Sequence, residues 1–200
     1  MNNRTSLLYS IPLVALFFVS SKQVTMETYM LDKNESTITW KGSMKFSSNS
    51  HFGYARVWRG ALMIQDEQLS GGTVVVDMNS FQDERHESRN DLIDHLKSPD
   101  FFDVIKFPVS SFEITRVGPS VKGNVNITGN LTIKGITHPV TFPAKLDLKA
   151  GVVKAEGKLT IDRTKWDVRY GSGRFFSNLA DETISDEIEL EVKLVARRNE

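Results

Sequence analysis

The sequence contains no cysteine, which excludes disulfides, thiolate metal ligands, a thiol nucleophile and a lipidated N-terminal cysteine. It has no net charge either: 25 Lys and Arg residues balance 25 Asp and Glu residues, so no strong field attracts nucleic acid or an anionic membrane surface. The GxSxG, P-loop and GxGxxG motifs are also absent. We therefore expect no nucleic-acid partner and no enzymatic activity.

Long apolar runs are missing too. A membrane-spanning helix needs about 20 consecutive apolar residues, whereas the N-terminal run of residues 7–19 has about thirteen and is interrupted by serine and proline. Arg4 is the only charge before Lys22, and small residues at 19–21 offer a cleavage site. We predict a signal peptide at residues 1–21, a periplasmic or secreted location in a bacterium and no membrane span in the mature protein; an uncleaved anchor is the alternative.

The chain does contain segments that alternate apolar and polar residues, within a composition of 40% hydrophobic and 25% charged residues that is typical of a soluble domain. This period of two predicts strands with one wetted face, and such strands form antiparallel rather than parallel sheet. We expect a polar segment at residues 22–35 and one domain at residues 36–198. The longest apolar rows are Val125, Ile127, Leu131 and Ile133; Val140, Phe142, Ala144, Leu146 and Leu148; Val153, Ala155, Leu159 and Ile161; and Ile188, Leu190, Val192, Leu194 and Ala196.

Two other local patterns break or join these strands. Residues 84–97 are rich in charge and place Leu92, Ile93 and Leu96 at helical spacing, which predicts a helix that ends near Pro99. Residues 66–72 end in two glycines and predict a hairpin loop between strands at 55–65 and 73–81. The whole pattern predicts an all-β fold, an extended antiparallel β-barrel of about eight strands with one inserted α-helix.

Glycine and alanine interrupt the apolar rows. A glycine inside a strand costs entropy and packing, so Gly129 and Gly157 mark sharp bends or places where another group approaches closely. With Ala144 and Ala155 on the same rows, two interpretations stay open. The barrel is either hollow and lined for an apolar guest, or filled, with the small residues allowing curvature only.

Residues 95–103 read HLKSPDFFD and are followed by KFP at 106–108 and by Phe112. Together with SHFG at 50–53, LSGG at 69–72 and GNLTIKGITHPV at 129–140, these residues resemble the signature of YceI-like proteins. The resemblance implies a lipocalin-like extended antiparallel barrel with a helix beside it, which is usually exported and in some members holds a polyisoprenoid chain in its pore. The sequence differs from many relatives at residues 90–94, where an Arg-Asp pair commonly precedes the histidine.

We therefore predict an exported protein that holds a long isoprenoid chain, a polyprenyl lipid or the tail of an isoprenoid quinone, for transport, storage or sequestration. No cofactor is obligatory, and a homodimer is possible. The predicted ligand-binding residues are Val125, Ile127, Phe142, Leu146, Leu159 and Leu190 on the inner rows; Trp40, His51, His95 and Trp166 near the ends of the channel; and the aromatic residues Phe52, Phe101, Phe102 and Phe112. The aromatic residues have an alternative use in packing the helix against the barrel.

The histidines do not predict a metal site, because none of them shows a ligand spacing such as HExxH. Two further hypotheses compete with lipid binding. One is a filled barrel that acts as an envelope interaction module, with its partner on an outer face or on the loop at residues 169–178. The other is an isoprenoid-modifying or hydrolytic enzyme, which needs convergent polar groups within the pore.

Overall fold

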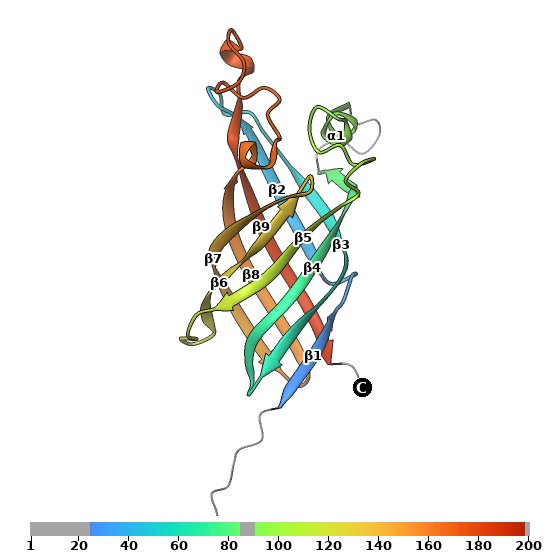
Figure 1. Ribbon diagram of the computed structural model, residues 1–200, viewed down its shortest axis with the longest axis vertical. Coiled ribbons are helices and arrows are strands. Elements are labelled where there is room, and N and C mark those ends of the chain that lie inside the picture. The colour runs from blue at the N-terminus through green and yellow to red at the C-terminus, as the bar shows by residue number, and fades with distance from the viewer. Residues whose placement is uncertain (1–24, 85–90, 199–200) are drawn as a thin grey trace, which may run out of the picture.

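The computed structural model describes residues 25–84 and 91–198 of the 200-residue chain, so the predicted signal peptide lies outside the described residues. The described strands form one antiparallel sheet that closes on itself as a barrel, which confirms the predicted fold class (Figure 1). The strands are β1 (Met26–Leu31), β2 (Thr37–Met44), β3 (Ser50–Gln65), β4 (Gln68–Asp83), β5 (Val109–Val117), β6 (Asn124–Ile133), β7 (Ile136–Lys149), β8 (Val152–Asp162) and β9 (Ile184–Arg198). One α-helix, α1 (Asp91–Lys97), and the 3₁₀ helices η1 (Arg163–Trp166) and η2 (Ala180–Glu182) complete the described elements.

Strands β1 and β2 share one position of the barrel, so the 9-stranded sheet closes as eight positions. Both pair with β3 and β9, with β2 toward one end and β1 toward the other. Between them, Asp32 Oδ1 accepts hydrogen bonds from the backbone N–H groups of Asn34 and Glu35, a turn that satisfies the backbone where the strand is interrupted. Figure 1 places β1 and α1 at opposite ends of the barrel, which we call the β1 end and the α1 end.

The barrel begins earlier than the sequence predicted. Strand β1 lies inside the range 22–35 that was expected to be a polar segment before the domain. Tyr29 and Leu31 are buried in the core at the β1 end, while Met26, Thr28 and Met30 are exposed. Because only two inward residues carry its alternation, this strand gives a much weaker periodic signal than β6 to β9 do.

The alternation predicted for the long strands is confirmed. In β6, all five inward residues, from Val125 to Ile133, are buried, and Gly129 is among them. A Cβ atom added at Gly129 would lie 2.3 Å from Cζ of Phe112 on the neighbouring strand. At Gly157 it would lie 2.7 Å from Cε2 of Phe142. The glycines therefore admit aromatic rings, which agrees with the interpretation of these positions as places where another group approaches closely.

The hairpin and the helix differ in extent from the predictions. Strands β3 and β4 are joined by Asp66 and Glu67 alone, both with positive φ (49° and 63°), and not by a loop at residues 66–72. Strands β3 and β4 pair directly from this turn onward, and Leu69 packs inward opposite Ile64. Gly71 and Gly72 lie next to a β-bulge, where the register shifts between Met63 and Ile64. Helix α1 ends at Lys97, as expected from Pro99, but Glu84 lies in a turn and residues 85–90 lie outside the described residues.

Two apolar clusters follow one another along the barrel. The cluster toward the β1 end includes Leu62, Val153 and Ala196, whose side chains are almost fully buried. The cluster at the α1 end packs Ile93 and Leu96 of the helix with the aromatic rings of the barrel. Among the described residues, no helix combines the length and apolarity needed to cross a bilayer.

Candidate functional site: a cavity inside the barrel

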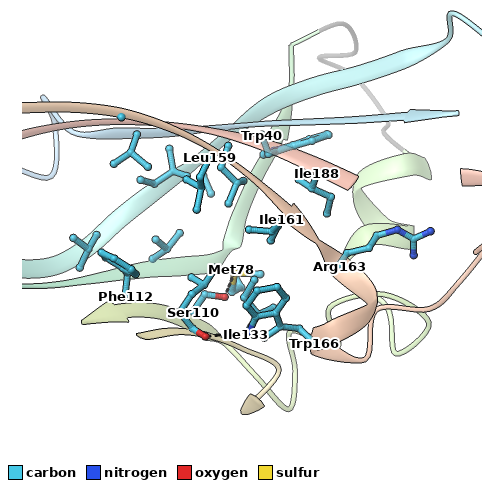
Figure 2. Close-up of a pocket in the computed structure, with 18 of the residues that line it drawn as sticks. Trp40, Met78, Ser110, Phe112, Ile133, Leu159, Ile161, Arg163, Trp166 and Ile188 are labelled. Atoms are coloured by element: carbon cyan, nitrogen blue, oxygen red, sulfur yellow. Dashed lines mark hydrogen bonds between the residues drawn. The ribbon is translucent and has the colours of Figure 1, made fainter. Parts of the chain in front are cut away.

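A cavity of about 330 Å³ lies inside the barrel, within the size range of small-molecule sites. Strands β2 to β9 and helix α1 contribute to its wall, which is almost entirely apolar because most inward positions of these strands carry an aliphatic or aromatic side chain. In Figure 2, Phe112, Leu159, Ile161 and Ile188 surround this space. Because the wall leaves room that side chains do not fill, the hollow interpretation of the barrel is the one that the structure supports.

Most of the predicted ligand-binding residues meet at this cavity. Those that line it are Trp40, His51, Phe101, Phe102, Phe112, Ile127, Phe142, Leu159, Trp166 and Leu190. They come from seven strands, from η1 and from the segment after α1, so the fold gathers residues that are far apart in the sequence. That they contact a ligand stays a prediction.

Four predicted residues lie elsewhere. Phe52 does not line the cavity, since it alternates with the inward His51 along β3. His95 packs edge-on against Phe101 and Tyr170, with ring centroids 5.0 and 4.5 Å away, beside the helix. Val125 and Leu146 line a second cavity of about 190 Å³ at the β1 end, because their strands extend beyond the floor of the main cavity.

Several other residues that line the cavity were not predicted from the sequence. Strand β4 contributes Leu69, Val74 and Met78, and Ser110 of β5 donates a hydrogen bond to Sδ of Met78 over 2.9 Å (Figure 2). The available signal was strand parity, because residues two apart on one strand share a face. Parity also identifies Arg163, which follows the inward Ile161 by two positions.

Arg163 is the charged group of the described wall whose side chain is most deeply buried, with 2% exposure. Its Nε, Nη1 and Nη2 atoms donate hydrogen bonds to the backbone carbonyls of Ser185, Val168 and Ile184 over 2.9, 2.8 and 3.3 Å. Burial lowers its pKa, and the carboxylate of Asp186 opposes this effect. The guanidinium thereby ties the start of β9 to the residues after η1, at the α1 end of the cavity.

Asp162, next to Arg163, anchors the same region. Its Oδ1 atom accepts hydrogen bonds from the backbone N–H and the hydroxyl of Thr164 over 3.1 and 2.6 Å, and Oδ2 lies 2.8 Å from Nη1 of Arg174. Burial raises the pKa of Asp162, but the bonds from Thr164 and Arg174 outweigh burial, so the pKa lies below its ordinary value of 3.8. This carboxylate is therefore ionised near neutral pH and holds Arg174 of the loop.

The cavity wall has the chemistry of a binding site. Apart from Arg163, Glu156 and His51, the polar residues that line it are serines. Two of these serines, Ser110 and Ser111, come directly before Phe112 on β5. Within residues 25–84 and 91–198, no group of three or more His, Asp or Glu side chains is arranged to hold a metal ion. An apolar guest would be stabilised by roughly 25 cal/mol per Å² of its surface removed from water.

Comparison with known proteins gives a consistent family match. The family model of the YceI-like domain matches residues 29–196 of this chain. A UPF0312 protein of Shewanella denitrificans is 36% identical over 109 residues, which cover 51% of this chain and 55% of that protein. Protein YceI of Salmonella newport is 31% identical over 135 residues, which cover 67% of this chain and 69% of that protein. The chain thus spans little more than half of the first relative and about two thirds of the second.

Two solved structures share the fold. BcnA of Burkholderia cenocepacia superposes with a TM-score of 0.64 at 22% identity, covering 83% of this chain and 99% of BcnA. A polyisoprenoid binding domain from Saccharophagus degradans, implicated in plant cell wall breakdown, superposes with a TM-score of 0.63 at 15% identity, covering 86% of this chain and 98% of that domain. At these identities the likeness establishes the barrel architecture.

Proposed function

The chain belongs to the family of YceI-like domain proteins, and from this premise we propose that it binds one long isoprenoid chain inside its barrel. The chain would be that of a polyprenyl lipid or the tail of an isoprenoid quinone, bound for transport, storage or sequestration. The observation that carries the proposal is the cavity of about 330 Å³ with an almost wholly apolar wall. A guest in such a cavity needs a large apolar surface and few polar groups.

Two further observations support this proposal. The fold is shared with a polyisoprenoid binding domain, so the architecture can accommodate this class of ligand. The N-terminal pattern of one early charge, a short apolar run and small residues favours export, which would place the protein beside a membrane that contains such lipids. We therefore propose a periplasmic or secreted binding protein.

The test of this proposal narrows the cavity without changing the outer surface. Ala155 lies on β8 and lines the cavity, so Ala155→Leu places three more carbon atoms in the space that the guest would occupy. Thr160→Leu is the matched control, since Thr160 is an exposed residue of the same strand. We expect the Ala155 variant to bind a prenyl lipid at least tenfold more weakly than the wild type in a fluorescence titration, and the Thr160 variant to bind it normally.

Equal binding by both variants would refute the proposed site. Loss of thermal stability in Ala155→Leu without loss of binding would show that the leucine is accommodated elsewhere, which also contradicts the proposal. A filled barrel acting as an interaction module is less well supported, because the cavity is present. The observation that still favours a docking role for the loop at residues 169–178 is the exposure of Tyr170, Phe175 and Phe176.

A further inference from the structure

The second cavity, of about 190 Å³, directly follows the main cavity along the inside of the barrel. On β6, Ile127 lines the main cavity, and Val125, the next inward residue, lines the second one. Strand β8 repeats this change, with Ala155 in the main wall and Val153 in the second. Residues two apart on a strand are separated by about 7 Å, so a single layer of side chains divides the two cavities.

Leu69 of β4 belongs to this dividing layer. Of the described residues that line the two cavities, it is the one that lines both. It is 6% exposed and pairs with Ile64 of β3, which lines the second cavity. The next buried position of β4, Gly72, has no side chain, and a Cβ atom there would lie 3.0 Å from Cδ2 of Leu62. Leu62 lines the main cavity, so Leu62 and Leu69 together form its floor on this side of the barrel.

The polar groups of the main cavity indicate which end of a bound lipid meets this floor. Ser43, Arg163 and Ser185 line the cavity at the α1 end, where β2 ends, η1 follows β8 and β9 begins. Leu69 and Leu194 line the opposite end. A buried polar group is costly unless it finds a hydrogen-bond partner, so the polar end of a lipid belongs at the α1 end. Its hydrocarbon terminus then points toward Leu69.

The second cavity offers a less apolar environment than the main one. Glu67 and Gln68 of the β3–β4 turn line it together with Ser120, and all three residues are exposed. Water can therefore solvate this part of the wall from the β1 end. A hydrocarbon terminus that stops at Leu69 keeps an apolar surrounding, whereas one that continued would have to displace the leucine and the water beyond it.

We propose that Leu69 limits the length of isoprenoid chain that the barrel can enclose. The terminus of the ligand rests against Leu69, and any further isoprene units stay outside the cavity at the α1 end. This inference rests on the proposed function and specifies its ligand by length. Binding tightens with each isoprene unit until the terminus reaches Leu69 and then levels off, because only units inside the cavity are removed from water.

The experiment titrates the full-length protein with prenyl alcohols that differ from one another by one isoprene unit. Leu69→Ala removes three carbon atoms from the dividing layer and joins the two cavities. We expect the affinity of the wild type to rise with chain length and to reach a plateau. In Leu69→Ala the plateau should begin at least one isoprene unit later, where the variant binds about tenfold more tightly than the wild type.

Leu148→Ala is the matched control. Leu148 lines the second cavity and not the main one, so this substitution removes the same three carbon atoms and leaves the dividing layer intact. We expect its plateau to begin at the wild-type chain length. A plateau that moved equally in both variants would show that any loosening of the barrel admits longer chains, which contradicts a specific role of Leu69.

NMR of the wild type gives an independent readout that needs no variant. The alcohol at the plateau length carries carbon-13 in the methyl groups of its hydrocarbon terminus. We expect nuclear Overhauser contacts from these methyl groups to the methyl groups of Leu69, and none to those of Val125, which lines only the second cavity.

Three further results would overturn the length limit: a wild-type affinity that rises without a plateau, an identical plateau in the wild type and Leu69→Ala, or contacts from the terminal methyl groups to Val125 in the wild type. The NMR measurement decides the matter even where Leu69→Ala fails to fold. Failure of every prenyl alcohol to bind the wild type is a different outcome, which would overturn the proposed function together with the length limit.

Discussion

At the scale of single residues, Gly129 and Gly157 matter because each leaves room for an aromatic ring of a neighbouring strand. The backbone carbonyl of Glu113 and the ring of Phe112 occupy the space that a side chain at Gly129 would need, at 2.4 and 2.3 Å from an added Cβ. Phe112 and Phe142 then pack against each other, with centroids 5.6 Å apart and an interplanar angle of 51°. Space that two glycines leave is thus used by two aromatic residues of the cavity wall.

This arrangement predicts a large effect of a small substitution. In Gly129→Ala, the methyl group would overlap a ring and a backbone oxygen, and the backbone oxygen cannot move without disturbing strand pairing. We expect the free energy of unfolding to fall by about 1–3 kcal/mol in a urea titration.

Gly42→Ala is the matched control for that titration. An added Cβ at Gly42 has no atom within 4 Å, so the change in the free energy of unfolding should stay within about 0.5 kcal/mol. If Gly129→Ala proved as harmless as the control, the ring of Phe112 would not depend on the glycine, and the packing explanation would be wrong.

At the scale of elements, the segment between β8 and β9 is held over the α1 end of the barrel by four charged residues. Arg174 bridges Asp162 and Asp186 with distances of 2.8 and 3.0 Å, and Arg163 lies 3.9 Å from Asp186. Backbone hydrogen bonds add to this, among them the one from Ile184 to Gly171 over 2.8 Å. Both the loop and the rim of the cavity therefore depend on this cluster.

Asp162 gives the cluster a pH dependence of defined sign. Because the pKa of Asp162 is lowered by folding, its contribution to stability is complete above its unfolded value of about 3.8 and is lost as the pH falls through the lower folded value. We expect hydrogen exchange of residues 169–183 to accelerate, after correction for intrinsic exchange rates, when the pH falls from 7 into this range.

Asp162→Asn should reproduce that loosening at pH 7, because the amide keeps the shape and removes the charge that holds Arg174. Asp147→Asn, at an exposed residue of β7, is the control and should leave the exchange rates of the loop unchanged. Wild-type exchange rates in Asp162→Asn would mean that the backbone bonds alone hold the loop.

The elements also show where sequence reasoning was sufficient. The inward rows of β6 and β8 were predictable because four or five apolar residues repeat at a period of two. Strand β1 has two such residues, which is too few to separate it from a polar loop. The hairpin turn was misplaced because the glycines at 71 and 72 serve a bulge inside β4, and the actual turn uses Asp66 and Glu67 with positive φ, which sequence alone rarely predicts for acidic residues.

At the scale of the whole molecule, the barrel holds a main cavity of about 330 Å³ and a smaller one of about 190 Å³ at the β1 end. Side chains such as Val153 and Ala196 are packed to near-complete burial, whereas the wall of the main cavity leaves room for a guest. Periodicity could predict which residues face inward, but the cavity depends on where large side chains such as Phe112 and Phe142 turn, which requires coordinates.

Occupation of the cavity by an apolar isoprenoid chain is the central claim, and native mass spectrometry of the protein purified without added lipid tests it most directly. The account predicts a protein–lipid complex whose bound mass is that of a neutral prenyl lipid, released by organic solvent and restored by adding the same lipid. A spectrum showing the bare protein alone, unchanged after incubation with prenyl alcohols and quinones, would contradict the account.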